Sequence, residues 1–173
     1  GGIEASQALA EKLDSPVCCN YQHNDAFPIS HPLATGPLGY NGSKAAMQLI
    51  AKADVVLALG TRLNPFSTLP GYGIDYWPKD AKLIQVDINA DRIGLTKPVT
   101  VAIQGDAKRV AEQITEQLAK GAGDKGRAER VALIASTKEA WAKELAAMDH
   151  EDDDPGTTWN ERARGREPHR MSP

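Results

Sequence analysis

Two short apolar runs in this 173-residue sequence end in residues that could contact a ligand. Residues 53–60 (ADVVLALG) are followed by Thr61 and Arg62, and residues 83–89 (LIQVDIN) include Asp87 near their end. An apolar run that stops abruptly at glycine or aspartate is typical of a buried parallel strand whose carboxyl end opens onto a ligand crevice. The pattern therefore predicts a binding site on loops at one edge of a sheet.

Cysteine, histidine and acidic residues do not form a catalytic or metal-binding pattern. Cys18 and Cys19 are adjacent, so a bridge between them would be strained, and we interpret both as buried thiols in a reducing compartment. The acidic run 151–154 lacks the alternation of a calcium loop, which favours a solvated helix end. The histidines lack the spacing of metal ligands and are His23, His31, His150 and His169. We therefore predict no catalytic residue and no metal ligand in this chain.

Composition excludes several classes of partner. The formal net charge is −3 and 25% of the residues are charged, a balance that does not favour binding to nucleic acid or to an anionic membrane. The sequence contains no apolar run near the roughly 20 residues needed to span a bilayer, and its start does not resemble a signal peptide. We expect a cytoplasmic protein.

Helix and strand patterns alternate along the chain. The predicted helices cover residues 4–13, 44–52, 107–118 and 128–148, and the predicted strands cover 17–20, 54–59, 83–88 and 99–103. Residues 21–40 and 64–80 are predicted as long loops. The aromatic residues in loop 64–77 favour a contact between domains, with the lining of an acceptor channel as the alternative. The alternation predicts an α/β fold with a doubly wound parallel sheet.

The two ends of the sequence suggest a piece of a longer protein. Gly1 and Gly2 form the turn expected after a strand, so the first strand is predicted to be missing. Residues 160–173 are polar and have little to bury, which favours a linker. We therefore predict a central α/β domain at residues 1–120 and a linker with one helix at residues 121–173, leading to an absent C-terminal cofactor-binding domain.

Several motifs together carry a resemblance to a known family. The stretch 31–33 (HPL), the glycines between 36 and 42, ADVVLALGTR, LIQVDIN and the pair 105–106 resemble the central domain of thiamine-diphosphate-dependent enzymes. The resemblance is to the acetolactate synthase and oxalyl-CoA decarboxylase type, with a Rossmann-like fold. Residues 21–98 and 148–164 are very similar to a branch of acyltransferases that act on sulfoacetaldehyde.

The resemblance implies an activity for the complete enzyme. Sulfoacetaldehyde and phosphate would give acetyl phosphate and sulfite in sulfonate catabolism, with thiamine diphosphate and Mg²⁺ bound by domains absent from this chain. The alternative within the family is an acetolactate synthase-like enzyme of 2-oxo acids. Gly105-Asp106-Ala107 lacks the second glycine of the family's Gly-Asp-Gly cofactor motif, and Asp106 is interpreted as a helix N-cap. The chain alone is expected to be inactive, and the complete enzyme to be a homo-oligomer, a dimer or tetramer.

The resemblance also implies a role for this domain, which in related enzymes binds an ADP-containing nucleotide or only joins its neighbours. Glycine allows backbone amides to approach a phosphate, arginine can pair with it, and a carboxylate at a strand end can accept from a ribose hydroxyl. Because the sequence has no complete Gly-x-Gly-x-x-Gly, a scaffold without nucleotide stays open. The positions that match the nucleotide-contacting turns are Gly1, Gly2, Gly60, Thr61, Arg62, Asp87 and Ile88.

Overall fold

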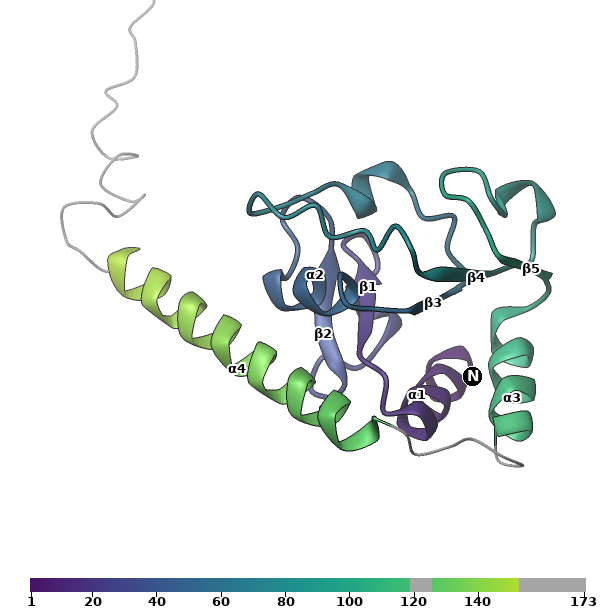
Figure 1. The fold of residues 1–173 in the computed structure, drawn as a ribbon, viewed down its shortest axis with the longest axis horizontal. Helices are drawn as coiled ribbons and strands as arrows, with labels where there is room; N and C mark the ends of the chain where they lie inside the picture. Colours follow the sequence, from purple (N-terminus) through teal and green to yellow (C-terminus); the bar gives the residue numbers. More distant parts are fainter. Residues whose placement is uncertain (119–125, 153–173) are drawn as a thin grey trace, which may run out of the picture.

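The computed structural model describes residues 1–118 and 126–152 as an α/β fold with two parallel sheets (Figure 1). Within these residues, no helix is both long enough and apolar enough to cross a membrane. The helices are α1 (Gly2–Leu13), α2 (Lys44–Ile50), α3 (Ala107–Leu118) and α4 (Arg127–Asp152). The strands are β1 (Val17–Asn20), β2 (Ala34–Leu38), β3 (Val55–Leu59), β4 (Lys82–Asp87) and β5 (Val101–Gln104), and short 3₁₀ turns occur at Asn24–Ala26, Pro65–Thr68 and Ala90–Arg92.

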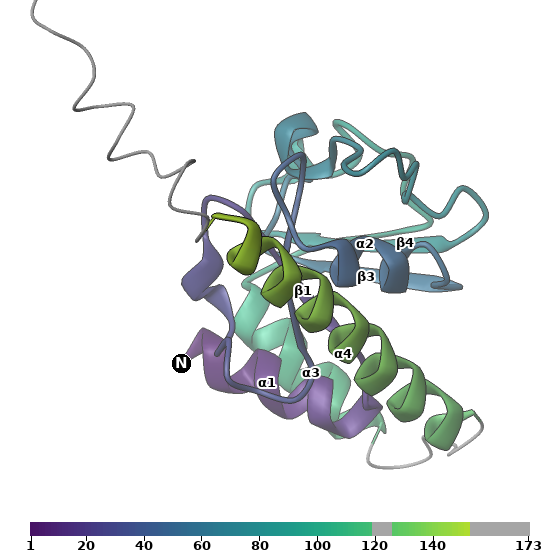
Figure 2. The same ribbon diagram turned by 90° about the vertical axis from the view of Figure 1, so that its left-hand side faces the viewer.

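All strand pairs are parallel, which confirms the predicted α/β class. β1 pairs with β2, and β3, β4 and β5 follow one another in a second sheet. Helices α1 and α3 lie side by side next to the three-stranded sheet, where Leu9 and Ala111 pack with Leu57 of β3 (Figure 2). Helices α2 and α4 contact each other beside the two-stranded sheet. The strands thus form two sheets in place of the single predicted one.

Side-chain caps explain where two of the helices begin. The Ser43 hydroxyl accepts a hydrogen bond from the Ala46 amide at 3.2 Å, at the start of α2. The Asp106 carboxylate accepts from the Arg109 amide at 3.0 Å, in the first turn of α3. The predicted N-cap role of Asp106 is therefore confirmed, and this cap fixes the turn that follows β5.

The prediction of one long loop over residues 21–40 is wrong, because Ala34–Leu38 forms strand β2. Gly36 and Pro37 concealed it, since both residues are unfavourable in strand interiors. Proline is tolerated here because β2 pairs only with β1 among the described residues. Gly36 has φ +93°, and a Cβ atom there would lie 2.7 Å from the Ser43 Cβ atom. This glycine therefore serves the close approach of β2 to the start of α2.

Helix α4 packs along the same core as the earlier elements. Ile134 is 3% exposed and lies in a cluster with Leu33 and Leu49. The Arg130 guanidinium donates to the carbonyl oxygens of Leu13 and Asp14, at 2.7 and 3.0 Å, and so satisfies the end of α1. The predicted division between residues 120 and 121 stays a prediction, and residues 119–125 and 153–173, including the tail 160–173, lie outside the described residues.

Candidate functional site

The turns that follow β3, β4 and β5 meet at the carboxyl edge of the three-stranded sheet. The Gly60 amide donates to the Val86 carbonyl oxygen at 2.8 Å, and the Gly105 amide donates to the Asp87 carbonyl oxygen at 3.0 Å. These bonds extend the parallel ladders by one residue beyond the strand ends. We name this region, formed by residues 60–62, 87–89 and 105–108, the carboxyl edge.

Two predicted glycines lie beside the amino end of α3. Gly60 has φ +61°, and a Cβ atom on it would lie 3.5 Å from the Ala107 Cβ atom. A Cβ atom on Gly1, just before α1, would lie 3.7 Å from Cδ of Lys108. The structure therefore brings Gly1 and Gly60 to the start of α3, while Gly2 has no neighbour within 4 Å of its Cβ direction. Free amides at helix starts attract anions, so this arrangement is compatible with a phosphate group.

Thr61 and Arg62 turn the chain back over the sheet. The Thr61 hydroxyl accepts from the Leu63 amide at 3.2 Å, and Leu63 has φ +52°. The Arg62 side chain is exposed, and the Arg62 carbonyl oxygen accepts from the Thr96 hydroxyl at 3.1 Å. An exposed guanidinium can reach a bound anion, whereas the Thr61 side chain is already engaged in the turn.

The Asp87 carboxylate has a local partner. Asp87 is 3% exposed, and its Oδ1 accepts from the Asn89 amide at 2.9 Å, which closes a turn after β4. Ile88, between them, is 70% exposed. The structure thus assigns Asp87 first to holding the turn, with little of its carboxylate open to a ribose hydroxyl.

The carboxyl edge carries charges of both signs. Asp106 caps α3, which places a carboxylate where a phosphate would otherwise approach that helix start. Lys108, in the first turn of α3, lies 3.7 Å from Glu112 in a partly exposed pair. The arrangement presents polar groups of both signs at the end of the sheet, and these groups do not form a paired nucleophile and base.

The cysteines and the buried tyrosine lie away from this edge and are poor nucleophiles. Burial raises the pKa of the Cys18 thiol to about 12, and burial also raises the pKa of Cys19. Burial raises the pKa of Tyr76 to about 12, and its hydroxyl donates to the Ser67 carbonyl oxygen at 3.5 Å. At ordinary pH all three groups are therefore protonated.

The described residues do not form a site for the diphosphate group of thiamine diphosphate and its Mg²⁺ ion. In the Gly105-Asp106-Ala107 turn the carboxylate of Asp106 already accepts the Arg109 amide. Within residues 1–118 and 126–148, no group of three or more His, Cys, Asp or Glu side chains is placed to hold a metal ion. A cofactor of that kind needs ligands from outside the described part of the chain.

Sequence reasoning missed Gln85, whose hydrogen bonds hold the turns next to this region, and Lys108, which lies beside Gly1. Gln85 is 1% exposed; its amide nitrogen donates to the carbonyl oxygens of Thr61 and Arg92, and its amide oxygen accepts from Gly94. The signal was present, because a glutamine inside the apolar run 83–89 must find hydrogen-bond partners. Lys108 carried no comparable signal.

Comparisons with known proteins show what the chain is similar to. Residues 1–114 match the family model described as "Thiamine pyrophosphate enzyme, central domain". The chain is 76% identical over 171 residues to a "Probable sulfoacetaldehyde acetyltransferase" of Rhizobium meliloti (strain 1021). The aligned residues make up 99% of the chain and 29% of that relative. It is 73% identical over 173 residues, all of the chain and 29% of the relative, to a "Sulfoacetaldehyde acetyltransferase" of Roseovarius nubinhibens (strain ATCC BAA-591 / DSM 15170 / ISM).

A more distant relative is a "Probable acetolactate synthase large subunit" of Methanocaldococcus jannaschii. It is 33% identical over 145 residues, which cover 84% of the chain and 22% of that relative. The chain thus spans less than a third of the length of these curated relatives. The match over residues 1–114, together with the parallel α/β fold, shows that the chain belongs to the family of thiamine pyrophosphate enzyme central domains.

Proposed function

We propose that the chain is the central domain of an enzyme that converts sulfoacetaldehyde and phosphate to acetyl phosphate and sulfite. The observation that carries this proposal is the contrast in identity: 76% and 73% to two proteins named for sulfoacetaldehyde, against 33% to one named for acetolactate. When bound, thiamine diphosphate would supply carbanion stabilisation. The proposal includes Mg²⁺ as its companion ion, a homo-oligomeric enzyme and a cytoplasmic location.

The contribution of these residues is structural in the first place. Helix α4 is held to the rest of the domain by an ion pair between Lys44 Nζ and Glu144 Oε2 at 2.7 Å. Arg130 also bonds to the end of α1, and the buried Ile134 packs in the core. Such a body can hold two flanking domains at a fixed spacing. We infer this spacing role for the chain and route no chemical step through its residues.

A second role, binding of an ADP-containing nucleotide at the carboxyl edge, is favoured by one observation. Gly60, with its positive φ, lies beside the start of α3, and Gly1, before the start of α1, lies beside Lys108. Calorimetry with ADP and the 173-residue chain tests this role, with Arg62→Ala and Lys108→Ala expected to weaken binding. Lys79→Ala, at the opposite edge, is the matched control. Absence of binding would leave only the spacing role.

The activity is tested on the complete enzyme by measuring sulfite release from sulfoacetaldehyde. We expect release that requires phosphate, thiamine diphosphate and a divalent cation, each shown by omission. Pyruvate under the same conditions is the control substrate. Turnover of pyruvate without sulfite release from sulfoacetaldehyde would replace the proposed substrate by a 2-oxo acid. Light scattering of the same preparation measures its molecular mass, and the mass of a monomer would contradict the proposed homo-oligomer.

A further inference from the structure

A cavity of about 620 Å³ lies at the opposite, amino edge of the three-stranded sheet. Val56 and Leu83 line it from the beginnings of β3 and β4, and Thr100 lines it just before β5. Its volume lies within the range of pockets that bind small molecules. We name it the amino-edge cavity, and it is separate from the carboxyl edge described above.

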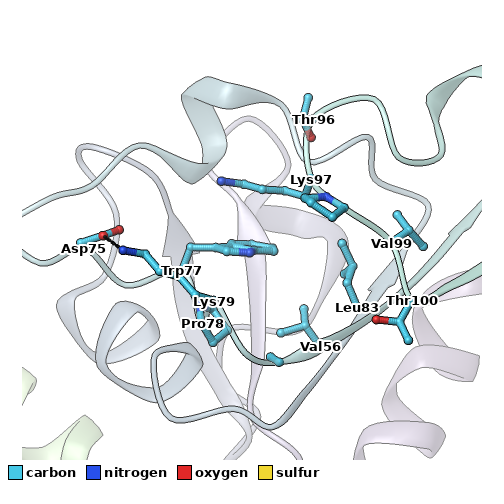
Figure 3. Close-up of a pocket in the computed structure, with 12 residues that line it drawn as sticks. Val56, Asp75, Trp77, Pro78, Lys79, Leu83, Thr96, Lys97, Val99 and Thr100 are labelled. Atoms are coloured by element: carbon cyan, nitrogen blue, oxygen red, sulfur yellow. Dashed lines mark ion pairs between the residues drawn. The ribbon is translucent and has the colours of Figure 1, made fainter.

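The floor of the amino-edge cavity is apolar. Leu83 is buried, and Val56, Trp77 and Val99 pack against the core cluster to which it belongs. Figure 3 shows the indole of Trp77 as a flat wall, with Leu83 and Val56 beside it. A ligand with an apolar body would remove these surfaces from water.

The charged group that distinguishes this cavity is the Lys97 ammonium. The Lys97 ammonium lies 4.9 Å from the centre of the Trp77 ring, and its side chain is partly buried (Figure 3). Within residues 1–118 and 126–148, none of the ion pairs includes Lys97. The second lysine at the rim, Lys79, is exposed and lies 3.4 Å from Asp75, which offsets its charge.

The wall that carries Lys97 is held in place before any ligand binds. The hydroxyl of the neighbouring Thr96 donates to the carbonyl oxygens of Arg62 and Leu63, at 3.1 and 2.9 Å. Earlier in the same loop, Gly94 donates to the buried Gln85 at 2.9 Å. Because this wall is already ordered, a ligand pays less conformational entropy when it binds. The Lys97 ammonium and the apolar floor therefore stay in a fixed arrangement that favours a ligand with both an anionic and an apolar part.

We propose that the amino-edge cavity binds a small organic anion, a sulfonate, carboxylate or phosphate monoester with an apolar body. The anionic group pairs with the Lys97 ammonium, and the apolar body lies against Trp77, Val56 and Leu83. Because the floor is partly shielded from water, the ion pair is stronger there than on an open surface. This inference concerns a site other than the carboxyl edge and does not rest on the proposed acetyltransferase activity.

Titration of the ¹⁵N-labelled 173-residue chain with benzenesulfonate tests the proposal by NMR. The readouts are the indole N–H of Trp77, assigned with Trp77→Phe, and the backbone amide of Lys97. Inorganic sulfate supplies the charge alone and benzyl alcohol supplies the apolar body alone. We expect saturable shifts at both readouts with benzenesulfonate, and binding about tenfold or more tighter than either part. Benzoate and phenyl phosphate then distinguish the three anionic groups.

Substitutions at the two lysines separate a specific site from surface charge. Lys97→Met keeps the apolar stem and removes the ammonium, so benzenesulfonate affinity falls about tenfold while benzyl alcohol is unaffected. Lys79→Met is the matched control and changes affinity by less than about twofold, since its pair is exposed. Lys97→Arg retains binding, and Lys97→Gln serves if Lys97→Met fails to fold. No saturable shift at Trp77, equal affinity for sulfate, or unchanged affinity in Lys97→Met and Lys97→Gln would each overturn the proposal.

Discussion

The two edges of the three-stranded sheet differ in the groups that they present. The carboxyl edge is made of backbone turns and helix starts, with Gly60 and Gly105 bonded across the strand ends. The amino-edge cavity is made of side chains from the beginnings of two strands and from irregular loops, with Trp77 and Lys97 as its main features. A ligand at the first edge would be recognised largely by backbone groups, and a ligand at the second largely by side chains. Conformational substitutions should therefore affect the first edge more than the second, and side-chain truncations the second more than the first.

Gln85, inside β4, bonds to Thr61 at the carboxyl edge and to Gly94 in the loop that leads to Lys97, so its replacement should have the largest effect. Gln85→Leu removes hydrogen bonds to Thr61, Arg92 and Gly94 in a side chain that is 1% exposed. Leaving these partly buried backbone groups without the Gln85 partner should lower the free energy of unfolding by roughly 2–4 kcal/mol, measured by urea denaturation. Gln104→Leu, on the exposed side of β5, is the control and should change stability little. Equal effects of the two substitutions would show that Gln85 does not hold the edges together.

A conformational substitution should affect the carboxyl edge in particular. Gly60 has φ +61°, so Gly60→Ala should cost about 1–2 kcal/mol of stability, although its Cβ atom meets only an ordinary contact at 3.5 Å. Gly60→Asn should cost less, because asparagine tolerates this conformation. Gly2→Ala is the matched control: Gly2 has open space around its Cβ direction and lies in α1, where alanine favours the helix. Thermal denaturation measures all three, and a neutral Gly60→Ala would remove the conformational argument.

The sequence predicted the carboxyl edge better than the amino-edge cavity, for a physical reason. Strands β3 and β4 and the capped start of α3 are local patterns, in which apolar runs end at Gly60 and Asp87 and a carboxylate precedes a helix. The cavity depends on loops that meet only in three dimensions. Trp77 and Lys97 are 20 positions apart in sequence, and no local rule pairs them.

Strand β2 shows a second limit of sequence reasoning. Gly36 and Pro37 favoured the prediction of a loop, because each residue type is unfavourable in the interior of a strand. Their presence is explained by tertiary packing, since Gly36 allows the approach of Ser43 at the start of α2. The helices were easier to predict: α3 covers the predicted residues 107–118, because apolar positions at helical spacing and the Asp106 cap agree.

The smallest expected effect concerns the hydroxyl that joins the two edges. Thr96 lies beside Lys97 in the cavity wall and donates to the carbonyl oxygens of Arg62 and Leu63, next to the carboxyl edge. Thr96→Val preserves the shape of the side chain and removes this donor, so it should lower stability by about 0.5–1.5 kcal/mol. Thr100→Val also lies at the cavity and is exposed, so it is the matched control.

The informative measurement on Thr96→Val is the pattern of NMR shifts. If the Thr96 hydroxyl couples the edges, Thr96→Val should shift both the Trp77 indole signal and the Gly60 amide signal. Thr100→Val should shift only the Trp77 indole signal. Shifts confined to Trp77 in both variants would mean that the loop holds the cavity wall without affecting the carboxyl edge. In that case the Thr96 hydrogen bonds, although they join the cavity wall to the turn after β3, would not couple the two edges.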